Sequence, residues 1–348
     1  MEDPIGIHPK EELAIMEMPG VRRGIPYGQK ILILGDTGFL GHHLLPVLEY
    51  AFPRADLVPI QGQRFFNLVS QHDISILFKK IDPDVVINMA ALSGGIEDNR
   101  NFQADYFYQN LMININVFEA CKLWRHTVKK LIAFVGGCAY PNDAESPIKE
   151  EDIWNGLPVQ TSLGYSMAKK TSLIAAFAYK DQWNLDTTIL IPGNMYGPWD
   201  NFHPKKSHVI PGLIRRIIEA KHEKYDSVTI WGSGRPVRDF VYVNDIAQLI
   251  PHFIDNYKSI GPVNISTGKG ITIKELAEII SELVGYQGKL YFDRSKPDGQ
   301  MIKTFDNTKL MDFAKELGIE IEFTELKDGL KNTIDWYEDR LLGLIKKV

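Results

Sequence analysis

The sequence predicts an α/β protein in which a doubly wound, mostly parallel sheet is joined to a smaller C-terminal α/β lobe. Three observations support this prediction. Short apolar runs alternate with helical segments from residue 30 to residue 191, which is typical of parallel strands buried on both faces. A glycine-rich turn, residues 35–41, follows the first run directly. After about Pro192, shorter elements alternate with loops rich in proline and glycine.

The elements of the first part follow one another in the order expected of repeated β-α-β units. Residues 1–28 contain prolines and no convincing periodicity, so we expect an extension ahead of the fold. Strands separated by helices imply right-handed crossovers and a parallel sheet covered on both sides. We expect strands at 30–34, 57–60, 84–88, 131–135 and 187–191, and helices at 39–50, 104–124 and 163–183.

The composition is that of an ordinary globular protein. The chain has 348 residues, of which 44% are hydrophobic, and a formal net charge of −5. A mildly acidic chain without a basic cluster argues against nucleic acid and anionic membranes as partners. No apolar run approaches the roughly 18 residues that a membrane span needs, and residues 1–4 do not resemble the start of a signal peptide. Two cysteines, Cys121 and Cys138, are too few for a disulfide framework or a structural zinc site. We therefore expect a cytoplasmic protein without a bound metal.

The glycine-rich turn indicates a dinucleotide site. Residues 35–41 read Gly-Asp-Thr-Gly-Phe-Leu-Gly and lie between a predicted strand and a predicted helix. Glycines let the backbone approach a pyrophosphate, and a helix N-terminus presents unpaired N–H groups to it. The context argues against the alternative, a glycine-rich turn without a ligand. We therefore expect a Rossmann-type domain with cofactor contacts at Gly35, Thr37, Gly38, Phe39, Leu40 and Gly41.

The choice between NAD and NADP depends on the end of the second strand. An acidic residue about 20 positions past the glycines would bind the adenosine ribose of NAD. Here residues 60–64 read Ile-Gln-Gly-Gln-Arg, without a carboxylate. Arg64 is suited to meet a 2′-phosphate, although it is equally compatible with a solvated loop. The sequence favours NADP, and NAD stays an alternative.

A second motif, Tyr165-Ser166-Met167-Ala168-Lys169, places a tyrosine and a lysine four residues apart. Such residues share one face of a helix. The lysine is expected to lower the pKa of the phenol and to hold the nicotinamide ribose, while Tyr165 serves as acid or base for a carbonyl/alcohol pair. Alone, this spacing also fits a surface tyrosine beside a solvated lysine. Together with the glycine-rich turn, it indicates hydride-transfer chemistry.

These motifs resemble the extended short-chain dehydrogenase/reductase superfamily. The resemblance narrows to GDP-L-fucose synthases and covers about residues 30–337. That family inverts carbons 3 and 5 of a GDP-4-keto-6-deoxy-hexose and then reduces its 4-ketone with NADPH, and it implies a homodimer packed through the helices at 104–124 and 163–183. The narrower resemblance lies in residues 194–211, in Trp-Gly-Ser-Gly at 231–234, in Arg-Asp-Phe at 238–240 and in Ser-Lys-Pro-Asp-Gly at 295–299.

The resemblance also implies roles for individual residues. Cys138 and His208 would exchange the protons at carbons 3 and 5, because a thiol and an imidazole both titrate near neutral pH. Without the family pattern, Cys138 fits a buried core residue and His208 a loop histidine. Tyr165 would be the acid for reduction and Lys169 its partner. The implied cofactor contacts are Ala90, Ala91, Lys169, Pro192, Asn194 and Met195. The implied substrate contacts are Asn194, Val209, Leu213, Arg216, Trp231, Arg238 and Lys296. The implied domains are a dinucleotide-binding domain at 29–192, to which some later segments return, and a mainly nucleotide-sugar-binding lobe at 193–348.

Two positions depart from the family pattern. Two residues before the cysteine the family has a serine, whose hydroxyl bonds the substrate carbonyl, whereas this chain has Gly136. Three alternatives stay open. Water or a backbone N–H takes the place of the hydroxyl, or the reduction is slow or lost and leaves an epimerase. In the third alternative the sugar, a hexose or a heptose, differs near its carbonyl. Residues 36–37, Asp-Thr, stand where the family often has a basic residue, which does not favour NADP. A non-enzymatic dinucleotide-binding protein is a further alternative, but such proteins usually lose the Tyr165/Lys169 pair.

Overall fold

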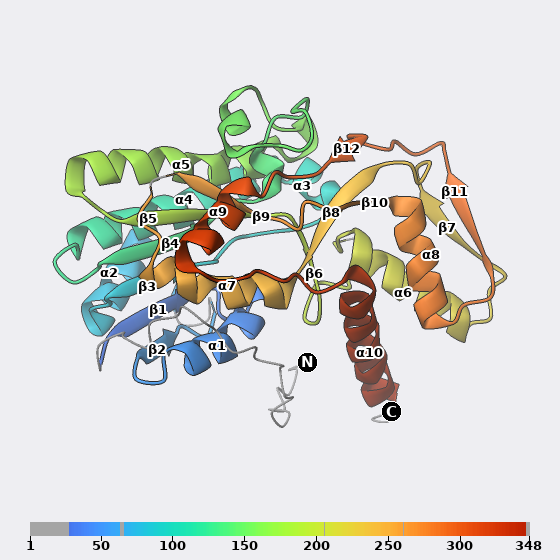
Figure 1. Cartoon of the computed structure of the whole chain (residues 1–348), viewed down its shortest axis with the longest axis horizontal. Coiled ribbons are helices and arrows are strands. Elements are labelled where there is room, and N and C mark those ends of the chain that lie inside the picture. The colour runs from blue at the N-terminus through green and yellow to red at the C-terminus, as the bar shows by residue number, and fades with distance from the viewer. Residues whose placement is uncertain (1–27, 63–65, 205, 260, 346–348) are drawn as a thin grey trace.

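A six-stranded parallel sheet forms the centre of the larger part of the molecule (Figure 1). The computed structural model describes residues 28–62, 66–204, 206–259 and 261–345, so the expected extension lies, apart from Gly28, outside the described residues. Every neighbouring pair in the sheet is parallel. In spatial order the strands are β2 (Asp56–Pro59), β1 (Lys30–Leu34), β3 (Val85–Asn88), β4 (Lys130–Phe134), β5 (Thr187–Pro192) and β9 (Pro262–Ile265).

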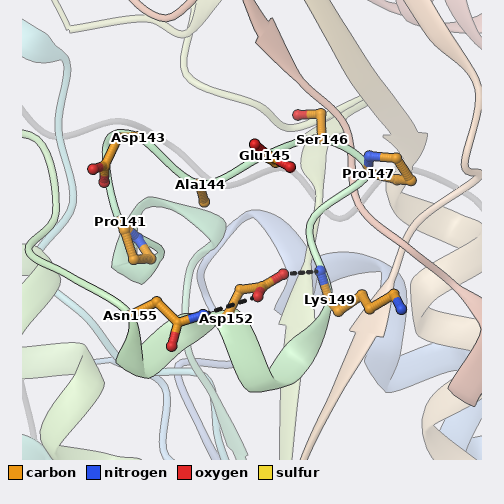
Figure 2. Close-up of a pocket in the computed structure, with 9 residues that line it drawn as sticks. All are labelled: Pro141, Asp143, Ala144, Glu145, Ser146, Pro147, Lys149, Asp152 and Asn155. Atoms are coloured by element: carbon orange, nitrogen blue, oxygen red, sulfur yellow. Dashed lines mark hydrogen bonds between the residues drawn. The ribbon is translucent and has the colours of Figure 1, made fainter.

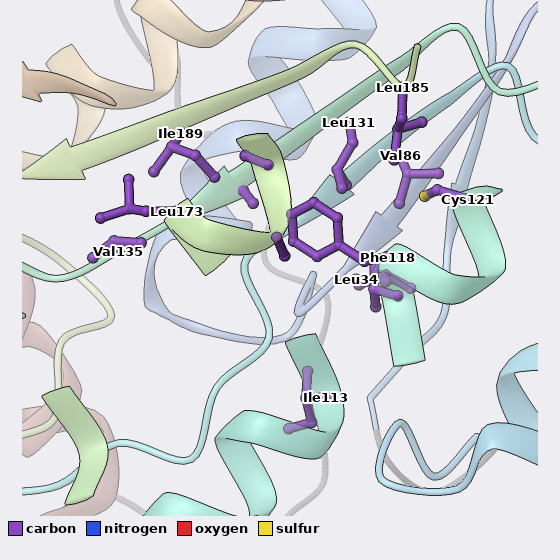
Figure 3. Packing of buried hydrophobic residues seen from close by; sticks show 14 of the residues in the cluster. Leu34, Val86, Ile113, Phe118, Cys121, Leu131, Val135, Leu173, Leu185 and Ile189 are labelled. Atoms are coloured by element: carbon purple, nitrogen blue, oxygen red, sulfur yellow. The ribbon is translucent and has the colours of Figure 1, made fainter. Parts of the chain in front are cut away.

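Helices cover both faces of this sheet, as a doubly wound fold requires. One hydrophobic cluster joins the sheet to α2 (Gln71–Ile81), α4 (Gln103–Leu123) and α5 (Leu163–Trp183). A second cluster joins its other face to α1 (Phe39–Ala51), α7 (Val243–Asp255) and α9 (Thr308–Leu317). Figure 3 shows Phe118 and Cys121 of α4 packed towards the sheet strands that carry Val86 and Leu131. Cys121 is therefore a core residue, and burial raises the pKa of its thiol.

The predicted elements of this part agree with the structure to within one residue at either end. Two helices have no counterpart in the sequence analysis, α2 and the short α3 (Ile96–Asn101). Helix α2 begins where the Ser70 hydroxyl accepts a hydrogen bond from the Asp73 N–H, and it buries only Ile74, Leu77 and Phe78. Its apolar stripe is thus short, which explains why the pattern did not predict it.

A smaller lobe adjoins the C-terminal edge of the sheet, to the right in Figure 1. Its core is built from apolar residues of three helices and the strands beside them. Strand β8 pairs with three strands, and β7 pairs with β11. The lobe contains β6 (Asn194–Tyr196), α6 (Val209–His222), β7 (Ser227–Trp231), β8 (Val237–Tyr242), β10 (Gly270–Thr272), α8 (Ile273–Val284), β11 (Lys289–Asp293), β12 (Ile302–Lys303) and α10 (Leu326–Ile345).

The fold class is confirmed, since a parallel six-stranded sheet flanked by helices carries a smaller α/β lobe. The division at residue 192 stays a prediction; β9, whose residues lie beyond it, is the last strand of the large sheet. None of the helices in the described part of the chain is long and apolar enough to cross a membrane.

Candidate active site

The sheet creates a switch point between β1 and β3. The chain leaves β1 towards β2 and later returns to β3 on the other side, so the segments that follow β1 and β3 part at this point. They also come very close together. Gly35 has φ +89°, and a Cβ there would lie 2.8 Å from the Ala90 nitrogen. A Cβ at Gly41 would lie 2.3 Å from the Asp36 carbonyl oxygen. Glycine is therefore required at both positions by backbone packing.

The N-terminus of α1 opens onto this loop. Gly38 is the N-cap and donates its N–H to the Gly35 carbonyl at 3.0 Å. The next N–H groups, of Phe39 and Leu40, belong to the unpaired first turn that every helix has. The first turn carries no acidic side chain. A pyrophosphate fits this arrangement, because a small backbone cradle meets the positive end of a helix dipole. Leu40 itself is buried in the core, so only its backbone can serve a ligand.

The end of β2 is tied to the same loop. The Gln61 N–H donates to Asp36 Oδ2 at 3.0 Å, and Gln61 has φ +57°. A Cβ at Gly62 would lie 3.1 Å from the Thr37 hydroxyl oxygen. One oxygen of the Asp36 carboxylate is thus engaged in holding the loop together. Arg64, predicted to meet a 2′-phosphate, lies outside the described residues.

Cys138, Tyr165 and Gly136 lie together at the carboxyl end of β4. Cys138 belongs to a short 3₁₀ turn, Gly137–Ala139, that follows the strand, and Tyr165 lies in the first turn of α5. A Cβ at Gly136 would lie 3.3 Å from Cys138 Sγ and 3.9 Å from Tyr165 Oη. The predicted thiol and phenol therefore border the same small space, and Gly136 leaves that space open.

Lys169 lies one helical turn after Tyr165 and is buried, with 3% of its surface exposed. Burial lowers the pKa of Lys169 to about 8, and the charge of Cys138 opposes this change. Burial also raises the pKa of Tyr165, and the charges of Cys138 and Tyr106 add to the increase. The expected lowering of the Tyr165 pKa by Lys169 is thus not what the structure gives. A phenol that keeps its proton is suited to act as an acid.

His208 is the N-cap of α6, and 60% of its side chain is exposed. Its Nδ1 lies 3.7 Å from Asp200 Oδ1, and this carboxylate raises the pKa of His208. Two residues earlier, Lys206 forms an ion pair with Asp98 of α3 at 3.3 Å.

Further contacts connect the Lys206–Asp98 ion pair to Tyr165, the candidate catalytic tyrosine. Asp98 also accepts a hydrogen bond from the Tyr106 hydroxyl at 3.2 Å. The Tyr106 ring packs edge-on against Tyr165, with centroids 6.3 Å apart. The segment that carries His208 is therefore joined, through α3 and α4, to the side of the sheet where Tyr165 lies.

The predicted nucleotide contacts occupy the smaller lobe. Trp231, at the end of β7, is 68% exposed, and Lys296 Nζ lies 5.6 Å from its ring centre. Burial lowers the pKa of Arg238, which marks a partly desolvated positive charge. Arg216 donates to the carbonyls of Gly212 and Thr229 at 3.0 and 3.1 Å.

The remaining predicted contacts differ in exposure. Val209 is 37% exposed, whereas Leu213 is fully buried in the core of the smaller lobe. The side chain of Leu213 therefore does not face an open surface, and its expected substrate contact stays a prediction. Asn194 is exposed and donates to the Asp239 carbonyl at 2.7 Å. Among the cofactor candidates, Pro192 is buried within β5, Met195 packs against the core, Ala90 is half-buried and Ala91 is exposed.

Lys303 is a site residue that the sequence analysis did not identify. It lies on β12, directly beside Arg238 of β8. Burial lowers the pKa of Lys303, and the neighbouring charges of Cys138 and Arg238 act on it in opposite directions. Lys303 thus adds a positive charge that interacts electrostatically with both Cys138 and Arg238. A single lysine in a segment without a motif carries no signal in the sequence, because only the pairing of β12 with β8 brings it here.

Asp298 has a supporting role in the smaller lobe. Its carboxylate accepts hydrogen bonds from the N–H and hydroxyl of Ser233. These bonds fix the turn that follows Trp231.

No cluster of three or more histidine, cysteine or acidic residues able to hold a metal ion occurs in the described part of the chain.

A separate cavity of about 570 Å³ lies beside the segment that follows Cys138 (Figure 2). Asp152 holds its floor by accepting hydrogen bonds from the Lys149 N–H and the Asn155 amide, both at 3.0 Å. The cavity is lined by Pro141, Asp143, Ala144, Glu145, Ser146, Pro147, Lys149, Asp152 and Asn155. None of these lining residues is a predicted site residue.

Comparison with known proteins identifies relatives of this chain. Residues 31–266 match the model of the NAD dependent epimerase/dehydratase family. The chain is 38% identical over 309 residues to GDP-L-fucose synthase 1 of Arabidopsis thaliana. The aligned residues cover 88% of this chain and 93% of the relative.

Two solved structures extend the comparison. A GDP-L-fucose synthetase from Naegleria fowleri bound to NADP has a TM-score of 0.81 and 26% identity, covering 90% of this chain and 95% of that chain. A GDP-6-OMe-4-keto-L-xylo-heptose reductase from C. jejuni has a TM-score of 0.80 and 30% identity, covering 90% of this chain and 98% of that chain.

Proposed function

This chain belongs to the NAD dependent epimerase/dehydratase family and, within it, to the GDP-L-fucose synthases, and we propose that it is an NADP-dependent epimerase/reductase acting on a GDP-4-keto-6-deoxy-hexose or a related GDP-4-keto sugar. One observation carries this proposal. Cys138 and Tyr165 border one small space at the end of β4, and the buried Lys169 lies one turn away on the same helix. A thiol, a phenol and an ammonium in this arrangement suit proton transfer around a ketone.

The cofactor is held at the switch point of the sheet. The backbone of residues 35–41 and the N-terminus of α1 form the pyrophosphate cradle, in which Gly35 and Gly41 leave room that a side chain would fill. Lys169 is the candidate for binding the nicotinamide ribose. When bound, NADPH supplies a hydride to the carbonyl carbon. The Naegleria fowleri structure, solved with NADP, supports this choice of cofactor.

Different residues of the chain carry out the proton transfers of epimerisation and of reduction. A ketone at carbon 4 acidifies the C–H bonds at carbons 3 and 5, so inversion needs one group that removes a proton and another that returns one. Cys138 and His208 take these roles. Tyr165, whose pKa is raised by burial, donates its proton to the ketone oxygen. Lys303 beside Cys138 provides positive charge where negative charge develops.

The nucleotide end of the substrate is bound by the smaller lobe. Trp231 offers an exposed ring for stacking on a base, and the partly desolvated Arg238 offers a charge that a diphosphate would compensate. Arg216 and Lys296 lie on the same lobe and extend the positive surface. We therefore expect GDP to bind in the absence of the sugar.

The proposal extends to the assembly and location of the protein. Helices α4 and α5 pack against each other, and their outer surface exposes Phe107, Tyr108, Ile174 and Phe177. Large exposed apolar residues on neighbouring helices mark an interaction site, and a second copy of the same helix pair would cover it with closed symmetry. We therefore propose a homodimer. The two unbridged cysteines fit a reducing compartment such as the cytoplasm.

The decisive experiment uses GDP-4-keto-6-deoxy-mannose with NADPH, and separately with NADH. Absorbance at 340 nm reports reduction, and mass spectrometry in heavy water reports exchange at carbons 3 and 5. We expect exchange in both arms and oxidation of NADPH. Cys138→Ala should abolish the exchange without changing NADPH binding. A wild-type protein that shows neither exchange nor oxidation would refute the proposed function.

A second candidate function is epimerisation with little reduction. Gly136 favours it, because the space beside Tyr165 Oη holds no second side-chain donor from that position. Exchange in heavy water without a change in absorbance would identify this case.

A further inference from the structure

The loop between β6 and α6 carries a buried carboxylate that the reaction outlined above does not use. Asp200 has a side chain that is only 3% exposed, and its Oδ1 lies 3.7 Å from Nδ1 of His208. Oδ1 also accepts the Asn201 N–H at 2.7 Å. Oδ2 is buried and has no hydrogen-bond partner in the described part of the chain. A buried carboxylate is costly unless a positive group compensates it, and His208 is placed to do so.

The loop is held on one side by α1. We refer to residues 197–203 as the Trp199 loop. His43 Nε2 donates to the Pro198 carbonyl at 2.9 Å, and the His42 ring stacks on Trp199 with centroids 4.2 Å apart. His42 in turn contacts the Gly38 carbonyl through Nδ1 at 2.8 Å. The helix that begins at the cofactor loop thus fixes the residues directly before Asp200.

The C-terminal helix holds the Trp199 loop on the other side. The Arg340 guanidinium lies 4.6 Å from the Trp199 ring centre and 5.0 Å from that of Trp336. Tyr337 stacks on Phe202 with centroids 4.2 Å apart. Aromatic and cation–π contacts of this kind each contribute on the order of 1 kcal/mol. Asp200 is therefore bracketed by Trp199, which lies between α1 and α10, and by Phe202, which packs on α10.

From this arrangement we propose that Asp200 is a positioning residue for His208, which it holds by Nδ1 so that Nε2 exchanges the proton with the sugar. The proposal deepens the proposed function and rests on it for the role of His208. A carboxylate that orients an imidazole fixes its tautomer and stabilises the protonated form. In that form His208 returns a proton to carbon 3 or 5, while Cys138 removes one.

The charges around His208 agree with this assignment. Asp200 approaches it from the Trp199 loop, and the same carboxylate raises the pKa of His208. Lys206 points its ammonium to Asp98 of α3, which keeps that positive charge engaged elsewhere. In the same loop, the His203 N–H donates a hydrogen bond to Asn201 Oδ1 at 2.9 Å.

The test compares Asp200→Asn with Asp245→Asn in the full-length protein. Asparagine keeps the shape of Asp200 and an oxygen for the Asn201 N–H. Asp245 is an equally buried carboxylate, since each of the two whole residues is 8% exposed, but it accepts hydrogen bonds from Thr324, whereas Asp200 lies beside His208. The first readout is the NMR titration of the His208 ring, assigned by its loss in His208→Gln. The second is the rate of deuterium exchange, with kcat and KM determined separately.

We expect Asp200→Asn to shift the His208 titration to lower pH and to reduce kcat for exchange by about 10- to 100-fold with KM unchanged. Asp245→Asn should leave the His208 titration unchanged. An unaltered His208 titration in Asp200→Asn, or an equal loss of exchange in both variants with equal loss of thermal stability, would overturn the proposal. If wild-type protein shows no exchange while the titration shifts as expected, the positioning contact stands and the proposed function fails.

Discussion

Gly136 stands where the resemblance to GDP-L-fucose synthases implies a serine, and a side chain there requires Cys138 to shift by a few tenths of an ångström. Its φ is −74°, an ordinary value for any residue, and a Cβ would meet only Cys138 Sγ at 3.3 Å and Tyr165 at 3.9 Å. A serine hydroxyl at this position would lie beside the Tyr165 phenol. The site would then have a second donor for the oxygen on which negative charge develops.

We therefore predict that Gly136→Ser increases the rate of NADPH oxidation by about 10²-fold, the order of magnitude that one such donor contributes. Stopped-flow absorbance at 340 nm measures the rate, and the affinity for NADPH serves as the control because the cradle is unchanged. Fast reduction by the unmodified protein that Gly136→Ser does not improve would mean that another donor already fills the space.

Arg238 provides a second prediction for a single residue. Its guanidinium is partly desolvated and lies beside Lys303, so a bound diphosphate would relieve the repulsion between two positive groups. Arg238→Ala should weaken GDP binding by about 2 kcal/mol, the scale of one charge-assisted hydrogen bond. Calorimetry with GDP gives the change. Arg235→Ala, an exposed arginine on the preceding turn, is the control, and stabilisation by UDP equal to that by GDP would contradict the assignment of the base.

At the scale of elements, helix α1 couples the cofactor loop to the rest of the site and does so through a buried histidine. His43 is 3% exposed, and burial lowers its pKa from 6.5 to about 4. The folded protein therefore keeps His43 neutral where the unfolded chain would protonate it. Stability from this group is complete above about pH 6.5 and is lost as the pH falls towards 4.

The expected loss is about 3 kcal/mol at most. His43→Gln, which can still donate to the Pro198 carbonyl, should lose less stability than wild type between pH 7 and pH 5. Urea denaturation at the two pH values measures the difference. His126→Gln, at an exposed histidine, should behave like wild type. Equal acid sensitivity of all three proteins would show that other groups, such as the buried His252, dominate.

The elements that the sequence predicts well are those with a single dominant signal. The strands of the large sheet are continuous apolar runs, and the glycine loop requires its glycines for backbone reasons that the structure confirms at Gly35 and Gly41. The sequence does not predict α2, because only three of its residues are buried. The sequence also does not identify Lys303 or Asp200 as site residues. Only the tertiary structure brings Lys303 towards Cys138 and Asp200 towards His208. The position of Leu213 within a familiar pattern did not reveal that its side chain lies in the core of the smaller lobe, and its substrate contact stays a prediction.

At the scale of the whole molecule, the exposed apolar surface of α4 and α5 is where we propose that two chains associate. Ile174 and Phe177 are 57% and 44% exposed and lie one turn apart on α5. Phe177→Glu should place a charge in the interface and convert the dimer to a monomer. Light scattering coupled to gel filtration measures the mass. Ile76→Glu alters an equally exposed residue on α2 and should leave the mass unchanged; a monomeric wild-type protein would refute the proposed dimer.

The path of the chain between the two parts of the molecule has a consequence for how such an enzyme can acquire a new substrate. The chain crosses from the sheet side to the smaller lobe and back several times, near residues 193, 243, 266–269, 304–307 and 318–325. Strand β9 closes the sheet against β5, and α9 packs on the same side. No single cut in the gene therefore yields an exchangeable lobe. Recombination with a related gene would break the sheet, so we expect new sugar specificity to arise through point substitutions in the segments around Cys138 and His208, with the dinucleotide-binding scaffold inherited whole.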